Sequence, residues 1–232
     1  MINIDFESLA LLSMGQMHLV LVPYSYLNAH YSSLDAKSVL NNEELSYLES
    51  LHCRPIYSRF LMTRFFLKSL LSYYLKIPVQ QVKLIRQDSG KLMICEDLFF
   101  NLSHSKDFLL FGFSLDSDVG VDVQFRTDSL KYTALARRFF LKADYDYFLS
   151  LSFVDQRLFF YQSWVYKEAY VKYYGHRLLP LLSRLITPTI SLKKLFDCMD
   201  GLQCYMDGVD EEYAFAAVCS KAIRQVHFFD IF

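Results

Sequence analysis

The chain has 232 residues, of which 53% are apolar and 17% aromatic, and its 24 basic and 25 acidic side chains leave a formal net charge of −1. The apolar fraction excludes a disordered chain, because disordered chains lack the apolar surface that offsets the entropy of ordering. The near-zero charge argues against a protein that grips nucleic acid over a broad surface, which needs clustered lysines and arginines. The length suits one domain or two small halves that share a core.

The start of the chain and its cysteines favour a protein of the reducing cytoplasm. Residues 1–8 include two acidic side chains, whereas a signal peptide begins with basic ones. The longest uncharged run, residues 8–34, could cross a bilayer by length, but polar residues and a proline interrupt it. We therefore expect a loop, a buried strand over residues 18–24 and a second loop. The five cysteines form no Cys-x-x-Cys pair, so free buried thiols are expected rather than zinc ligands or disulfides.

The first half of the chain predicts helices followed by short strands. Asn41 begins a helix as a capping amide, with carboxylates in the next turn at the positive end of the helix dipole. Pro55 opens a second helix that runs to about Lys76 and ends before Pro78. Short strands are then expected over residues 82–86, 92–95 and 108–114, with a turn at 89–91 between the first two.

The second half repeats this order of elements. A strand over residues 119–125 is followed by helices at about 129–141, 144–151 and 155–174, the last ending at Gly175. Strands are expected near residue 190 and over 202–206, 213–219 and 225–228. This repeat, with a period of about 100 residues, predicts an α+β fold of two similar halves, residues 1–117 and 118–232.

The strand over residues 119–125 carries a first candidate site. Its valines point one way, whereas Gly120, Asp122 and Gln124 point the other way. An acid beside a glycine leaves room for a metal ion or a phosphate group. The alternative is an edge strand with a solvated polar face.

The helix over residues 155–174 carries a second candidate site. Trp164, Glu168 and Lys172 share one face of this helix. Asp122 of the strand and Glu168 of the helix could together bind Mg²⁺, which prefers one or two carboxylates plus phosphates and waters. Lys167 and Lys172 would then balance phosphate charge. The alternative is an ion pair between Glu168 and Lys172, with Trp164 in the core.

Residues 99–105 carry a third candidate site. Two phenylalanines lead into Asn101, Ser103 and His104, which we interpret as a turn whose hydroxyl and imidazole groups could bind an anion. The alternative is an ordinary turn between strands with an exposed histidine. Lys91 in the turn at 89–91, and Arg64 with Lys68 on one helix face, could be solvated or could face a phosphate.

The order of these motifs carries more information than any one of them. Gly90-Lys91, FFNLSHS at residues 99–105, VGVDV at 119–123 and WVYKEAYVK at 164–172 follow one another along the chain. In this order the sequence resembles the 4′-phosphopantetheinyl transferases of the longer, Sfp type. The resemblance extends from about Arg59 to Gly175.

The resemblance implies an enzyme that transfers the 4′-phosphopantetheine arm of coenzyme A to a serine of an apo acyl or peptidyl carrier protein. The co-product is adenosine 3′,5′-bisphosphate, as for a holo-[acyl-carrier-protein] synthase. The implied fold is a pseudo-dimer of two α+β halves with the active site in the cleft between them, which favours a monomer. A cytoplasmic enzyme of fatty-acid, polyketide or nonribosomal-peptide biosynthesis, without nucleic-acid or membrane partners, is expected.

The resemblance also implies roles for single residues. Asp122 and Glu168 would hold Mg²⁺ on the pyrophosphate of coenzyme A, where Lys172 would add positive charge. Glu168, directly or through a water, would take the proton of the incoming serine. The set implied to bind coenzyme A is Lys91, Ser103 and His104 at its 3′-phosphate end, Lys167 near the phosphates, and Lys68, which replaces a usual arginine and loses the bidentate fork.

Gln124 departs from the pattern of the family. Many relatives have an acid there, so Mg²⁺ would lose one charged ligand, and we expect a water or the Gln124 amide oxygen to fill the position. This departure keeps open a non-catalytic relative that binds coenzyme A or carrier protein. An unrelated Mg²⁺-dependent phosphotransferase or nuclease is a third possibility, opposed by the near-neutral charge and the lack of a Walker-type loop.

Overall fold

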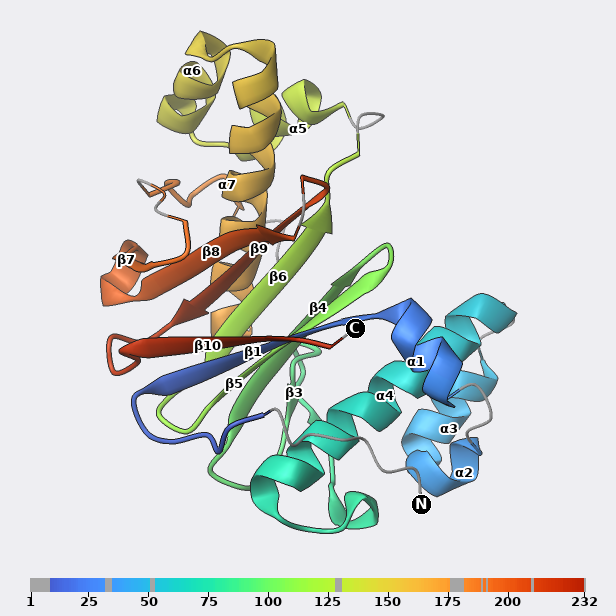
Figure 1. Ribbon diagram of the computed structural model, residues 1–232. Coiled ribbons are helices and arrows are strands. Elements are labelled where there is room, and N and C mark those ends of the chain that lie inside the picture. Colours follow the sequence, from blue (N-terminus) through green and yellow to red (C-terminus); the bar gives the residue numbers. More distant parts are fainter. Residues whose placement is uncertain are drawn as a thin grey trace.

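The computed structural model describes residues 9–31, 35–50, 53–127, 131–175, 182–188, 190, 192–209 and 211–231. Helices and strands are both abundant, which confirms the predicted α+β class. The strands form two four-stranded sheets and a separate two-stranded hairpin (Figure 1). The hairpin consists of β2 (Ile85–Arg86) and β3 (Leu92–Met93), which pair antiparallel on either side of the predicted turn.

The first sheet has the strand order β10-β1-β5-β4. Its strands are β1 (Gln16–Pro23), β4 (Phe99–Ser105), β5 (Phe108–Ser114) and β10 (Gln225–Asp230). β1 pairs parallel with β10 and antiparallel with β5, and β5 pairs antiparallel with β4. The sheet therefore combines strands from distant parts of the sequence.

The second sheet has the strand order β6-β9-β8-β7 and is antiparallel throughout. Its strands are β6 (Val119–Phe125), β7 (Leu195–Asp197), β8 (Gln203–Val209) and β9 (Tyr213–Cys219). The predicted division of the chain between residues 117 and 118 falls in the loop from β5 to β6. It stays a prediction, and β10 crosses it to join the first sheet.

One long helix packs on each sheet. The helices are α1 (Tyr24–Tyr31), α2 (Ala36–Val39), α3 (Asn42–Glu49), α4 (Arg54–Leu75), α5 (Tyr132–Phe139), α6 (Lys142–Ser150) and α7 (Phe153–Tyr174), with short 3₁₀ turns at Val79–Gln81 and Met199–Gly201. In Figure 1, α4 runs beside the first sheet with α1–α3 around it, and α7 lies behind the second sheet with α5 and α6 at its far end. Each helix and its sheet share a buried apolar cluster.

A third buried cluster joins the two sheets face to face. Leu19 and Leu21 of β1 meet Val121 and Val123 of β6 and Phe215 of β9, all fully buried or nearly so. This cluster buries the faces that the long helices leave uncovered. The two sheets therefore share one buried interior, to which Val119, Val121 and Val123 contribute from one face of β6.

The predicted helix ends are confirmed at three places. Asn41 and Glu44 form a capping box at the start of α3. Pro55 lies in the first turn of α4, where its missing N–H costs nothing. Gly175 ends α7 in the left-handed conformation, with φ of 66°. The expected helix start near residue 129 lies outside the described residues.

Three predictions of secondary structure are wrong. Residues 99–105 form strand β4 and not a turn, because their polar side chains alternate along an extended backbone and bind the neighbouring strand. Part of the second expected loop is α1, whose Tyr24, Leu27 and Tyr31 bury one face. Ile190 lies outside a strand, and among the described residues that follow it the first strand is β7.

All five cysteines are free thiols, as predicted, but Cys53 and Cys95 are exposed while Cys204 and Cys219 are buried. Within the described ranges, no helix combines the length and the hydropathy that crossing a membrane requires.

Candidate active site

The two sheets meet where edge strand β4 lies against edge strand β6. Side chains of β4 replace the backbone partners that β6 lacks on this edge. The Asn101 amide oxygen accepts a hydrogen bond from the Val121 N–H at 3.1 Å, and the Ser105 hydroxyl accepts one from the Phe125 N–H at 3.0 Å. We call this line of contacts the seam. It satisfies buried backbone donors and fixes the register between the two strands.

Between these two contacts the seam holds a buried carboxylate. Asp122 is 2% exposed, and its Oδ1 accepts hydrogen bonds from the Ser103 hydroxyl at 2.7 Å and from the Lys172 ammonium at 2.6 Å. Lys172 also donates to the Ser103 hydroxyl at 2.8 Å. The other carboxylate oxygen, Oδ2, is buried without a hydrogen-bond partner. A buried, unsatisfied oxygen is costly unless something else binds it.

Glu168 faces the same point from α7. Its Oε2 lies 3.9 Å from the Lys172 ammonium, and its side chain is 13% exposed. Burial and the negative charge of Asp122 raise the pKa of Glu168 to about 8, against the pull of Lys172 and of a hydrogen bond from Trp164. Two acids compete here for one ammonium, and the second keeps its proton near neutral pH.

Gly120 lets α7 come close enough to β6 for Glu168 to approach Asp122. A Cβ atom at Gly120 would overlap the carbonyl oxygen of Ala169 and the backbone nitrogen of Tyr173. The backbone of α7 thus rests directly on β6, one turn beyond Glu168. The sequence suggested that the space beside Gly120 could hold a ligand, but the backbone of α7 fills this space.

The residues of this centre fit a divalent cation. Asp122 offers an oxygen whose available partner is the proton held by Glu168, and Glu168 offers a second carboxylate whose charged form Asp122 disfavours. A cation would satisfy both groups, because Mg²⁺ takes oxygen ligands and needs one or two carboxylates. Within the described residues, no group of three or more His, Cys, Asp or Glu side chains could hold a metal ion. The remaining ligand positions are open to phosphate oxygens and water.

A basic pocket lies at one end of the seam. It has a volume of about 300 Å³, and its walls come from α4, the β2–β3 hairpin, β4 and the end of α7. Its basic lining residues are Arg64, Arg86, Lys91 and Lys172, and its described lining includes no acidic side chain. Three of the four basic groups pair with carboxylates behind the wall: Arg64 with Glu44, Lys91 with Asp118 and Lys172 with Asp122. The pocket still presents only basic charged groups on its described lining, which favours an anion.

A second pocket, mainly apolar, lies at the other end of the seam. It has a volume of about 340 Å³ and lies beside Ser105 and Gln124. Phe125, Phe160 and Trp164 are among the side chains of its walls. Lys172, Glu168 and Trp164 follow each other at intervals of four residues on α7. The pair of Asp122 and Glu168, which we call the acidic centre, therefore lies between the two pockets.

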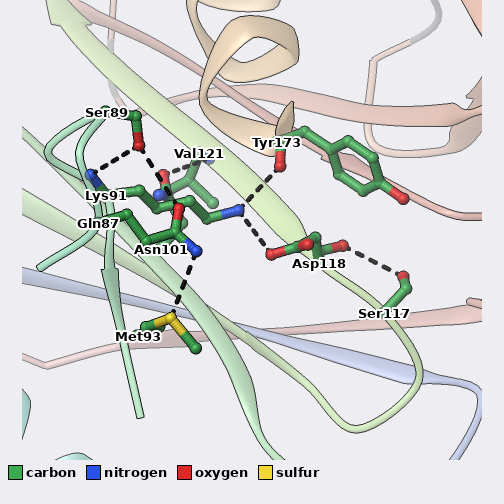
Figure 2. A network of polar contacts seen from close by, with 9 residues as sticks. All are labelled: Gln87, Ser89, Lys91, Met93, Asn101, Ser117, Asp118, Val121 and Tyr173. Atoms are coloured by element: carbon green, nitrogen blue, oxygen red, sulfur yellow. Dashed lines mark hydrogen bonds and ion pairs between the residues drawn. The ribbon is translucent and has the colours of Figure 1, made fainter. Parts of the chain in front are cut away.

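The structure engages Lys91 and Gln124 in contacts within the protein. The Lys91 ammonium donates to Asp118 at 2.6 Å and to the carbonyl oxygen of Tyr173 at 2.8 Å (Figure 2). The amide oxygen of Gln124 accepts a hydrogen bond from the Ser105 hydroxyl at 3.0 Å. Both residues line a pocket, but their polar groups already have partners.

His104 follows Ser103 on β4, near the acidic centre. Partial burial and the positive charges of Lys172 and Arg59 lower the pKa of His104, against the effect of Asp122. The imidazole is therefore biased toward its neutral form, in which one ring nitrogen still donates a hydrogen bond.

Lys68 and Lys167 are not brought to this site. The Lys68 ammonium donates to the Val39 carbonyl at 2.7 Å and pairs with Glu44 at 3.0 Å. Lys167 is fully buried and pairs with Asp144 at 2.8 Å. The sequence predicted both as contacts to coenzyme A, but their acidic partners lie more than twenty positions away along the chain, where local pattern does not reveal them.

Sequence reasoning missed one wall of the basic pocket. Arg86 was not singled out, although it flanks the Gly-Lys turn and the hairpin register places it opposite Leu92. Arg64 was noted only with Lys68, and the structure holds both at Glu44, whose carboxylate lies 3.1 Å from Arg64 Nε and 3.0 Å from Lys68 Nζ. Of the two, Arg64 also lines the pocket. The position of Arg86 beside a predicted turn was the available signal.

Residues 118–198 match the model of the 4′-phosphopantetheinyl transferase superfamily. The chain is 30% identical over 189 residues to the 4′-phosphopantetheinyl transferase HetI of Nostoc sp., and the match covers 78% of each chain. It is 25% identical over 162 residues to gsp of Aneurinibacillus migulanus and 29% identical over 137 residues to Sfp of Bacillus subtilis, both named as 4′-phosphopantetheinyl transferases. These two matches cover 70% and 56% of this chain, and 66% and 60% of the relatives.

Gly120→Ala should push α7 away from β6 and separate Glu168 from Asp122. We expect a loss of about 1–3 kcal/mol in the free energy of unfolding, typical of overpacking, and a clear loss of Mn²⁺ affinity by calorimetry. Val121→Ala removes a side chain from the opposite face of the same strand and serves as the control. It should lose stability but keep metal affinity, and equal metal binding by both variants would contradict this account of Gly120.

The stability of the protein should depend on pH through Glu168. Its folded pKa of about 8 lies above the ordinary value of 4.5, so the folded state holds the proton more tightly than the unfolded state. The resulting stabilisation is complete below pH 4.5 and is lost as the pH rises toward 8. Urea denaturation without divalent cations should show this decline, and Glu168→Gln should flatten it. The same slope in Glu168→Gln would assign the effect to other groups.

Proposed function

This chain belongs to the 4′-phosphopantetheinyl transferase superfamily, and we propose that it transfers the 4′-phosphopantetheine arm of coenzyme A to a serine of an apo carrier protein. The observation that carries the proposal is the linear order along the seam. A basic pocket, a pair of carboxylates and a mainly apolar pocket follow one another. Coenzyme A has the matching order of a phosphorylated nucleotide, a pyrophosphate and an uncharged arm.

The basic pocket is the proposed place for the nucleotide end of coenzyme A. Arg64 and Arg86 line it from the first half and Lys172 from the second. An arginine can hold a phosphate through two parallel hydrogen bonds. Ser103 is proposed to face the phosphates from the seam side of β4, where its hydroxyl already contacts Lys172. His104 is the next residue of the strand, and it is proposed to reach the phosphates from the other face.

Asp122 and Glu168 are the proposed ligands of Mg²⁺. When bound, Mg²⁺ would stabilise the negative charge that develops on the pyrophosphate oxygens. Lys172 lies within hydrogen-bond distance of Asp122 and can turn toward the same phosphate oxygens. Gln124 is proposed to remain at the side of this centre, because Ser105 already holds its amide oxygen.

The proposed reaction forms one bond and breaks one. The hydroxyl oxygen of the carrier serine attacks the phosphorus that carries the pantetheine arm, and the bond from this phosphorus to the bridging oxygen breaks. The bridging oxygen leaves with adenosine 3′,5′-bisphosphate. Glu168 takes the hydroxyl proton, directly or through a water, and it would be deprotonated for this role when a divalent cation is bound beside it.

The mainly apolar pocket beside Trp164 is the proposed place for the pantetheine arm and the approaching serine. Its aromatic walls can pack on the arm, and Lys106 lies at its lining. The proposed fold is a pseudo-dimer with the site between the halves. One chain supplies every side chain of the site, so we propose that a monomer is active.

Incubation with coenzyme A, Mg²⁺ and a panel of apo carrier proteins should raise the mass of a carrier by one phosphopantetheine arm. EDTA should prevent the gain. Asp122→Asn and Glu168→Gln should each lower the rate by about 100-fold or more, as expected for groups that stabilise the transition state. Asp97→Asn and Glu49→Gln remove exposed carboxylates and should keep the wild-type rate.

Two results would contradict parts of this proposal. Undiminished transfer by either seam variant would remove Asp122 or Glu168 from the mechanism. Coenzyme A binding without transfer to any carrier tested would favour the non-catalytic relative, for which the neutral Gln124 is the supporting feature.

A further inference from the structure

The β2–β3 hairpin forms one wall of the basic pocket but belongs to neither large sheet. Its strands are two residues each and pair only with one another. A two-stranded hairpin of this size has little stability of its own. Its position over the pocket must therefore depend on side-chain contacts with the rest of the protein.

Lys91 provides such a contact across the pocket. Its ammonium reaches Asp118, just before β6, at 2.6 Å and the Tyr173 carbonyl in the last turn of α7 at 2.8 Å (Figure 2). The side chain of Lys91 is only 8% exposed. The last four carbonyl groups of a helix lack partners within the helix, and a cation there is favourable to the helix dipole. Lys91 thus caps α7 from a different element.

The end of α7 packs tightly against the same hairpin. A Cβ atom at Gly175 would lie 3.3 Å from Lys91 Cδ, 3.4 Å from Gln87 Oε1 and 3.4 Å from Ser89 Oγ. Within the hairpin, the Ser89 hydroxyl contacts Gln87, and Lys91 N–H donates to Ser89 (Figure 2). The glycine that ends α7 therefore also makes room for the hairpin turn.

We propose that Lys91 is a positioning residue for the proposed coenzyme A site. Its ammonium binds Asp118 and the end of α7 and so fixes the position of the hairpin. The hairpin in turn maintains the shape of the basic pocket and the position of Lys172. This inference rests on the proposed function. It assigns Lys91 a role through Asp118 and Tyr173, in place of a direct contact to the 3′-phosphate.

If the contacts of Lys91 are lost, a smaller fraction of the molecules has the hairpin in the position that allows binding. If the hairpin leaves its closed position, the apparent dissociation constant rises in inverse proportion to the fraction of molecules that stay closed. The loss applies to any ligand of the pocket, whether or not it carries a 3′-phosphate. A direct phosphate contact, in contrast, would affect only ligands that carry this group.

Calorimetric titration with coenzyme A and with 3′-dephospho-coenzyme A separates the two roles. Lys91→Met keeps the aliphatic stem and should weaken both ligands by about 10-fold, or about 1.4 kcal/mol. Asp118→Asn should weaken both by a smaller factor, because Tyr173 still accepts a hydrogen bond. The double variant should bind no worse than Lys91→Met alone, since both changes break one contact.

A ligand-free readout and a matched control complete the test. Hydrogen exchange of residues 85–93 should be faster in Lys91→Met and Asp118→Asn than in the wild type. The increase should be confined to this segment, while the melting temperature falls by no more than a few degrees, as loss of one helix-end contact implies. Lys83→Met removes an exposed lysine from the same segment and should change neither affinity nor exchange.

The contrary outcomes are distinct. A loss of coenzyme A affinity in Lys91→Met, with unchanged affinity for the dephospho form, would overturn the positioning role in favour of a direct phosphate contact. Unchanged affinities in both variants would also overturn it. A wild-type protein that binds neither ligand would overturn the proposed function itself.

Discussion

Three side chains of β4 bind the edge of β6 that has no strand partner, and the order of the whole site follows from this seam. Asn101, Ser103 and Ser105 alternate along the strand and contact successive positions of β6. Because the spacing of a strand is regular, the contacts divide the seam into three levels. The first level opens to the basic pocket, the second holds Asp122, and the third borders the mainly apolar pocket. The fold thus provides an extended row of three binding regions along the seam.

The lysines with predicted roles are divided between the seam and the protein interior. Of the lysines with predicted roles, Lys172 reaches the acidic centre and Lys91 joins the hairpin to α7. Lys68 and Lys167 instead neutralise buried acids, where removing one partner would leave an unpaired charge. At the centre itself Lys172 contacts Asp122 far more closely than Glu168. This imbalance makes the site receptive to a second positive charge.

Much of the fold was predictable, because the spacing of apolar residues agrees with the residues that begin and end the elements along α4, α7, β5, β6 and β9. The alternation at Asp122 and the helical spacing at Glu168 correctly indicated which faces carry the acids. β4 was misread, because Asn and Ser favour turns by local chemistry, and only the neighbouring strand explains their role here. The partners of Lys68 and Lys167 were likewise set by tertiary contacts. Local pattern predicts which face a side chain shares, but not which distant acid meets it.

We propose that the pyrophosphate of coenzyme A lies at Asp122 and Glu168 while its 3′-phosphate lies in the basic pocket. Phosphorus NMR of bound coenzyme A with Mn²⁺ in place of Mg²⁺ tests this most directly, because the paramagnetic ion broadens the nearest phosphorus signals most. We expect stronger broadening of the pyrophosphate signals than of the 3′-phosphate signal, and its loss in Asp122→Asn. Strongest broadening of the 3′-phosphate, or unchanged broadening in that variant, would contradict the account.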